Sequence, residues 1–446
     1  MQIEGYPSAV LLLVLGIGSF LAVIRPYWAF LFGLFLITAG HTGKFNQTRL
    51  TGLGPYLNLA DACVLIAFAG FFFETIAAKR PVRLPQIVPL IVSVLIIAAA
   101  QTFWKFGWTY ETIRALRWGL QLPIFIFLGA NMVTSADRAR TLIGVLLAAA
   151  LAAALQHVCF AADTWMTRSL SMETYETMRT ISYWGGGMAS AFLLMIVVEK
   201  IPAGRGRQMF FLWAGFLLLA TLFLNQTRSI WLGTLGAIPC LLVLFRTRHP
   251  FQRIARFAVA AGILVVVSSW AVQRVMPGFS PLEMATGRLA QLTPDNPKSR
   301  IHTQTRVRAF NFEMDAWLNG TVLAGRGLWF VQKMRVSGDP EKDIAFAHLG
   351  YVTYLSQLGM MGFIIYAIYL PWGIIRGARQ LWYYANEPHV RYVALLGGAS
   401  ITFLSLMFAM SSQFLSPGFE APGVLYGAIW SFNRSRVGVW PESAHL

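Results

Sequence analysis

The chain has 446 residues, of which 56% are hydrophobic and only 12% charged, and its formal net charge is +17. Soluble domains carry about twice that charged fraction, so water is not the solvent for most of this surface. Lys and Arg cluster in short loops between apolar runs, a pattern that orients membrane helices, and nucleic acid is therefore not the expected partner. The composition predicts a polytopic integral membrane protein embedded in a lipid bilayer.

Apolar runs of helical length predict an all-α bundle with about 12 (12 to 13) transmembrane helices. The runs lie near residues 7–24, 27–40, 57–77, 86–104, 113–133, 141–162, 181–198, 208–224, 229–246, 257–275, 349–370, 392–413 and 421–432. A crossing needs about twenty apolar residues, so the short second and last runs suit re-entrant or tilted segments as well as full crossings. The first run lacks a basic leader and a cleavage site, and we expect it to be retained. One domain, residues 1–446, is expected to contain all of these helices.

Basic residues predict the orientation of the loops, because Lys and Arg favour the cytoplasmic side. Every second loop is basic, through Lys79, Arg80 and Arg83; Arg138 and Arg140; Lys200, Arg205 and Arg207; Arg246, Arg248, Arg253 and Arg256; and Arg376 and Arg379. The loops 105–112, 163–180 and 225–228 then face outward. Residues 276–347 form a large extracytoplasmic loop between helices 10 and 11, which we expect to cap a site. Arg25 places the N-terminus outside if the first two runs both cross.

Arg228 is the first candidate for a functional residue. It lies in the sequence LNQTRSIWLG, between two apolar runs with almost no loop to spare. An arginine at that depth is costly without an anionic partner. Its guanidinium is suited to bidentate binding of phosphate, and snorkelling to lipid headgroups is the alternative.

Further arginines lie at other outward ends. Arg179 precedes the sequence TISYWGGG, whose glycines allow close approach of a ligand or of a neighbouring helix. Arg114 and Arg117 are spaced i, i+3 and share one helical face, where they line a basic cavity or anchor the helix at the interface.

The large loop carries its own arginines. Arg306 and Arg308 precede an amphipathic-looking stretch, residues 309–318, and Arg326 follows between two glycines. The same stretch contains Glu313 and Asp315, so solvated ion pairs are an alternative to ligand binding.

His348 lies where the loop meets the next apolar run, just before Tyr351. The positive end of the helix dipole disfavours the imidazolium form there, and a neutral ring can accept a proton from a hydroxyl group. A structural histidine is the alternative.

Three cysteines lie inside apolar runs without paired spacing, and we found no nucleotide-binding motif and no acidic metal pair, so neither a metal site nor a soluble nucleotide-sugar donor is expected.

Three segments in this order resemble the O-antigen ligase and O-antigen polymerase family. The segment 227–233 is similar to the family's arginine motif, and the segment from Arg306 or Arg308 through Gly325-Arg326-Gly327 is similar to its arginine, helix and Gly-x-Gly pattern. The segment 347–351, running on to Gly359-Met360-Met361-Gly362, is similar to its histidine motif. Arg179 also lies where the family has an arginine before a Gly-rich helix start.

The resemblance implies a GT-C-like bundle in the bacterial inner membrane, with its site facing the periplasm. It implies a metal-independent, inverting glycosyltransferase without cofactors, which moves a glycan from undecaprenyl diphosphate to a hydroxyl of a lipid A-core or of a growing O-antigen or exopolysaccharide chain. His348 would be the base, and the diphosphate would be held by Arg179, Arg228, Arg306 or Arg308, and Arg326. Arg114, Arg117 and Tyr351 would line the cavity. A lipid-linked glycan flippase or other transporter, and a protein O-oligosaccharyltransferase, remain the alternatives.

Overall fold

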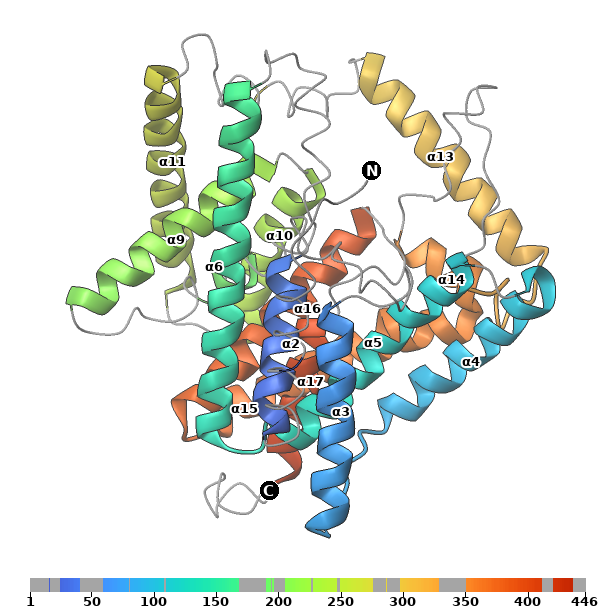
Figure 1. Cartoon of the computed structure of the whole chain (residues 1–446). Coiled ribbons are helices and arrows are strands. Elements are labelled where there is room, and N and C mark those ends of the chain that lie inside the picture. The colour runs from blue at the N-terminus through green and yellow to red at the C-terminus, as the bar shows by residue number, and fades with distance from the viewer. Residues whose placement is uncertain are drawn as a thin grey trace.

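The protein is described by a computed structural model. It describes residues 25–40, 59–79, 81–107, 110–167, 190–193, 205–225, 228–246, 249–275, 297–328, 350–410 and 420–435, and the single positions 16, 195 and 286. Within these ranges the regular secondary structure is helical, apart from one isolated bridge between Thr321 and Gly325, and short turns and loops join the helices (Figure 1). The helices are α2 (Pro26–Gly40), α3 (Leu59–Ala77), α4 (Ile87–Phe106), α5 (Tyr110–Met132), α6 (Ala136–Thr167), α9 (Arg205–Asn225), α10 (Arg228–Leu244), α11 (Pro250–Val275), α13 (Pro297–Leu318), α14 (Gly350–Phe363), the π-helix η5 (Ile364–Tyr369), α15 (Leu370–Tyr384), α16 (Pro388–Met410) and α17 (Glu420–Arg434).

Apolar helices confirm the membrane character of the chain. Four are long and apolar enough to cross a bilayer, over Ile87–Lys105, Ala136–Cys159, Gly350–Tyr384 and Pro388–Phe408. Shorter apolar helices cover Pro26–Ala39, Ala62–Ala77, Gly119–Met132, Gln208–Leu222 and Ser229–Leu244. The predicted runs 7–24 and 181–198 fall largely outside the described residues. The total of about twelve crossings therefore stays a prediction, as does the single domain with residues 276–347 as its cap.

Helices extend further into basic sequence than the apolar runs suggest. Arg376 and Arg379 were predicted to lie in a loop, but both are inside α15, which continues from α14 through η5. Their guanidinium groups lie over the rings of Trp372 and Tyr383, at 5.1 and 6.0 Å from the ring centres. A helix can continue through an arginine at the membrane surface, because the side-chain stem packs on apolar neighbours while the charged end stays in contact with polar groups.

The centre of the bundle is held together by close helix packing. Helices α5 and α17 run parallel, because Gly423 packs on Leu122 and Phe125 while Gly427 packs on the backbone at Ile126. Gly129 of α5 touches the backbone of α17 in the same way. Small residues at such contacts let helix backbones approach closely, which is how helices associate where burial of apolar surface gives little gain. Helix α17 is buried along almost its whole length.

A cluster of hydrogen bonds around Arg83 connects the loop between α3 and α4 to the rest of the bundle. The Asn131 carboxamide accepts a hydrogen bond from the Arg83 backbone N–H (2.8 Å) and donates to the Arg83 carbonyl (2.7 Å). The Arg83 guanidinium donates to the hydroxyls of Ser431 (2.7 Å) on α17 and Ser435 (3.1 Å) directly after that helix. One loop residue is thus bonded to two helices, which fixes how α4 enters the bundle.

We predict that Asn131→Ala destabilises the protein, because it leaves the backbone N–H and C=O of Arg83 without partners in a partly buried site. The expected cost is about 2 kcal/mol in the free energy of unfolding. Thermal unfolding in detergent measures it, with Asn386→Ala, at an exposed position, as the matched control. Equal melting temperatures for the two variants would contradict the stabilising role of the hydrogen bonds around Arg83.

Candidate functional site

Arg228 is the first residue of α10, and the helix start it belongs to is firmly held. The indole N–H of Trp231 donates to the Leu222 carbonyl of α9 at 2.7 Å. One turn along, the hydroxyl of Thr234 is 2.8 Å from that of Ser190. The Arg228 side chain lies outside the described atoms, but its backbone position is set by these contacts.

The start of α14 is fixed by aromatic residues. The Tyr351 hydroxyl, on a half-buried side chain, donates to the Ser405 carbonyl of α16 at 2.7 Å. Next on the same helix, the ring of Tyr354 stacks on Tyr366 of η5 at 5.3 Å and meets Phe408 of α16 edge-on at 6.2 Å. Position 348 precedes Gly350, the first residue of α14, by two residues.

Both helix starts pack against the same part of α16. Gly233, near the start of α10, contacts Phe403 and Met407 of α16. Tyr351 and Tyr354, near the start of α14, contact Ser405 and Phe408 of α16. The N-termini of α10 and α14 therefore lie at one end of the bundle, where the positive ends of their dipoles favour an anion.

Helices α5 and α17 begin at this end as well. Helix α17 follows the end of α16 after nine residues, and α5 runs parallel to it. Arg117 is half-buried near the start of α5, whereas only the backbone of Arg114 is described. In the first turn of α17, Glu420 is 2% exposed. Arg117, the buried acid Glu420 and the starts of four helices thus lie toward one end of the described part of the molecule.

Arg326 is held between α13, α14 and α4. Its backbone N–H donates to the Ser356 carbonyl of α14 at 2.9 Å, and its carbonyl accepts from the Lys105 ammonium of α4 at 3.2 Å. Its side chain runs along Gly320 at the end of α13. An arginine beside the last carbonyls of a helix also interacts favourably with the helix dipole. Arg326 therefore has a structural role at the end of α13, whether or not it also binds a ligand.

The turn around Arg326 is inserted into a break in α14. At Gly359 the backbone has φ 67°, and the helix is interrupted there. The N–H groups of Met360 and Met361 donate to the carbonyls of Val322 (3.0 Å) and Leu323 (3.1 Å). The carbonyls of Ser356 and Gln357 accept from Arg326 (2.9 Å) and Gly327 (3.0 Å). Gly325 and Gly359 touch backbone to backbone with no room for a Cβ atom on either.

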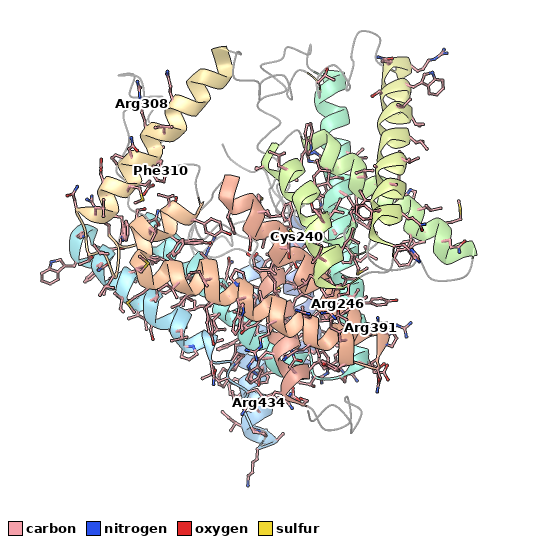
Figure 2. All side chains as sticks on the ribbon, turned by 180° about the vertical axis from the view of Figure 1, so that it is seen from behind. Cys240, Arg246, Arg308, Phe310, Arg391 and Arg434 are labelled. Carbon is pink, nitrogen blue, oxygen red and sulfur yellow. The ribbon has the colours of Figure 1, made fainter. Side chains whose placement is uncertain are left out.

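Helix α13 was predicted from its sequence over residues 309–318 and begins earlier, at Pro297. Its buried positions are Ala309, Glu313 and Ala316, whereas Asp315 and Arg308 are exposed. Glu313 is 4% exposed, so it is not a solvated partner of the loop arginines. Figure 2 shows Arg308 on the part of α13 that stands away from the bundle, far from Arg246, Arg391 and Arg434. Arg306 is on the same helix, and its side chain lies outside the described atoms.

Two predicted residues, Arg179 and His348, lie outside the described residues, so the structure does not place them relative to Arg228. Among the residues that the structure describes, no group of three His, Cys, Asp or Glu side chains could hold a metal ion.

Sequence reasoning missed Glu420 and the pairing of Gly325 with Gly359. The signal for Glu420 was an acid directly before the last apolar run, at a depth where a carboxylate is costly. The signal for the glycine pair was a Gly-x-Gly and a Gly-x-x-Gly segment that follow one another across the loop.

This geometry defines a class of protein: a helical membrane protein in which several helices, α10 with Arg228 among them, begin at one end of the bundle. Residues 213–367, which include Arg228, Arg306, Arg308, Arg326 and His348, match the family model described as O-antigen ligase. This match confirms the resemblance seen in the motifs and supports a glycosyltransferase activity of the O-antigen ligase and polymerase type. No curated protein matches the chain.

We predict that Gly359→Ala disrupts the inserted turn, because alanine has no room there and its φ of 67° is unfavourable for a residue with a Cβ atom. The strained backbone alone costs about 1–3 kcal/mol. Loss of thermal stability measures the effect, and Gly144→Ala, where a Cβ would meet nothing within 4 Å, is the control. If both variants unfold at the same temperature, the turn is not held as described.

Proposed function

We propose that the chain transfers a glycan from undecaprenyl diphosphate to a hydroxyl group of an acceptor at the extracytoplasmic face of the bacterial inner membrane. The observation that carries the proposal is the O-antigen ligase match over residues 213–367, inside which the starts of α10 and α14 pack on the same part of α16. The acceptor is a lipid A-core for a ligase, or the end of a glycan chain for a polymerase.

The diphosphate of the donor is the anion that this end of the bundle is suited to bind. Arg228, at the start of α10, and Arg179 would supply guanidinium groups, with Arg326 and either Arg306 or Arg308 contributing from the loop. The N–H groups at the helix starts add partial positive charge without a counterion. This charge stabilises the negative charge that develops on the leaving diphosphate, which is the task a metal ion performs in other transferases.

The chemical step needs a base at the acceptor hydroxyl. His348, in its neutral form, would accept the proton while the hydroxyl oxygen attacks the anomeric carbon from the side opposite the diphosphate. The new glycosidic bond forms as the bond between the anomeric carbon and the diphosphate oxygen breaks, so the configuration inverts and undecaprenyl diphosphate leaves. Arg114, Arg117 and Tyr351, near the starts of α5 and α14, would line the cavity in which these groups meet.

We predict that His348→Ala lowers the transfer rate by about 10²- to 10⁴-fold, the usual contribution of a general base. Arg228→Ala should weaken donor binding by about tenfold to a hundredfold, since each hydrogen bond to a charged group contributes about 1.5–3 kcal/mol. Both are measured with purified protein in liposomes, with a polyprenyl-diphosphate glycan as donor, from product formation and donor binding.

Arg434→Ala is the control, because Arg434 is exposed at the end of α17 and its guanidinium lies over Trp430, far from the helix starts. Full transfer by His348→Ala would eliminate it as the base. Movement of intact donor across the membrane with no glycosyl product would favour a flippase. In cells lacking the protein, single repeats left on the lipid carrier indicate a polymerase, whereas finished chains indicate a ligase for lipid or protein.

A further inference from the structure

The segment 319–328, here named the inserted turn, is bonded to two membrane-spanning helices. Besides its bonds to α14, its Leu328 carbonyl accepts from the Thr102 hydroxyl of α4 at 3.0 Å. The Leu328 N–H points to the Ala98 carbonyl at 3.4 Å. Both α4 partners lie inside the span Ile87–Lys105. Figure 1 shows α13, which leads into the turn, ending beside α4 and α14.

The contact lies at the same number of residues from the end of each of the two spans. Ala98 lies seven residues before Lys105, the end of its span. Gln357, which accepts from Gly327, lies seven residues after Gly350, the start of the other span. At a rise of 1.5 Å per residue, each offset is about 10 Å along the helix. The inserted turn therefore contacts both apolar spans about two helical turns inside their ends.

Backbone groups of the turn are hydrogen-bonded to the turn itself and to the two spans. The N–H groups of residues 324–328 all donate, to carbonyls of the turn itself, α14 or α4. Carbonyls at Val322, Leu323 and Arg326 accept from α14 or from Lys105. Irregular backbone is tolerated at membrane depth only where its polar groups are satisfied by protein or face a water-filled cavity.

The side chains at the tip of the turn are apolar and face outward. Leu323 is 65% exposed and Val322 is 43% exposed, although both follow a long polar loop. Met361, whose N–H bonds to the Leu323 carbonyl, is 40% exposed, and Ile364, three residues further along the same span, is 47% exposed. The tip thus continues the apolar outer surface of a membrane-spanning helix.

We propose that the inserted turn is a re-entrant membrane element whose Val322 and Leu323 side chains contact the acyl chains of the bilayer. Bilayer lipid is the occupant that fits, because the exposed apolar tip continues the apolar outer surface of a span and its carbonyls at Val322 and Leu323 are bonded to that span. The proposal is independent of the transferase activity, since it concerns only where this surface lies.

Spin-label accessibility tests the proposal. Cysteine is placed at Leu323, and separately at Val322, in a chain whose Cys63, Cys159 and Cys240 are replaced by alanine, and a nitroxide is attached in proteoliposomes. Oxygen collects in the bilayer and a neutral nickel complex stays in water. We expect a ratio of oxygen to nickel accessibility above unity at both positions.

Two matched positions calibrate the measurement. Ile96, 60% exposed in the middle of the α4 span, should give a ratio above unity, and the exposed residue Asp315 of α13 a ratio below unity. Labels at Leu323 and Val322 that match Asp315 would overturn the proposal, as would labels shielded from both reagents. Unchanged thermal stability of each variant shows that the label reports the native surface.

Discussion

The exchange of hydrogen bonds at Gly359 is the interaction on which the arrangement of residues 319–328 depends. In an uninterrupted helix the N–H groups of Met360 and Met361 would bond to the carbonyls of Ser356 and Gln357. The break frees these groups, and the backbone of the inserted turn takes both sets of partners. An unpaired N–H or C=O costs several kcal/mol in hydrocarbon, so the break and the turn require one another. Loop and span are consequently one structural unit.

This unit links residues to which the proposed mechanism gives roles. The inserted turn carries Arg326, follows directly on α13 and is locked into α14, the helix that begins two residues after His348. A shift of α13 with Arg306 and Arg308 would therefore be transmitted to the start of α14 through hydrogen bonds rather than through a long connection. Helices α10 and α14 both pack against α16. The helix that begins with Arg228 and the helix that contains Tyr351 are therefore positioned by the same neighbour.

The sequence predicted the helices well and their ends less well. Apolar runs located α2, α4, α10 and α16 because a bilayer demands apolar side chains over a helix length. The same rule misplaced Arg376 and Arg379, since stacking on aromatic rings lets a helix continue past its apolar part. For the site, local motifs found Arg228 at a helix start. They could not reveal that Gly325 and Gly359 meet, because such a contact depends on how segments thirty-four residues apart pack.

The location of the charged groups also explains why helix starts, rather than a soluble domain, surround the proposed site. A donor with a long apolar tail and a diphosphate headgroup is most stable with its phosphates at the membrane surface. Positive charge is least costly at the same level, where arginine can reach polar surroundings and helix N-termini supply N–H groups that have no partners within the helix. A buried acid, Glu420, lies in the first turn of α17, where the helix dipole stabilises its carboxylate. Helix starts at this level therefore combine lipid access with electrostatic stabilisation of the headgroup, and the inserted turn extends the same scaffold below the surface.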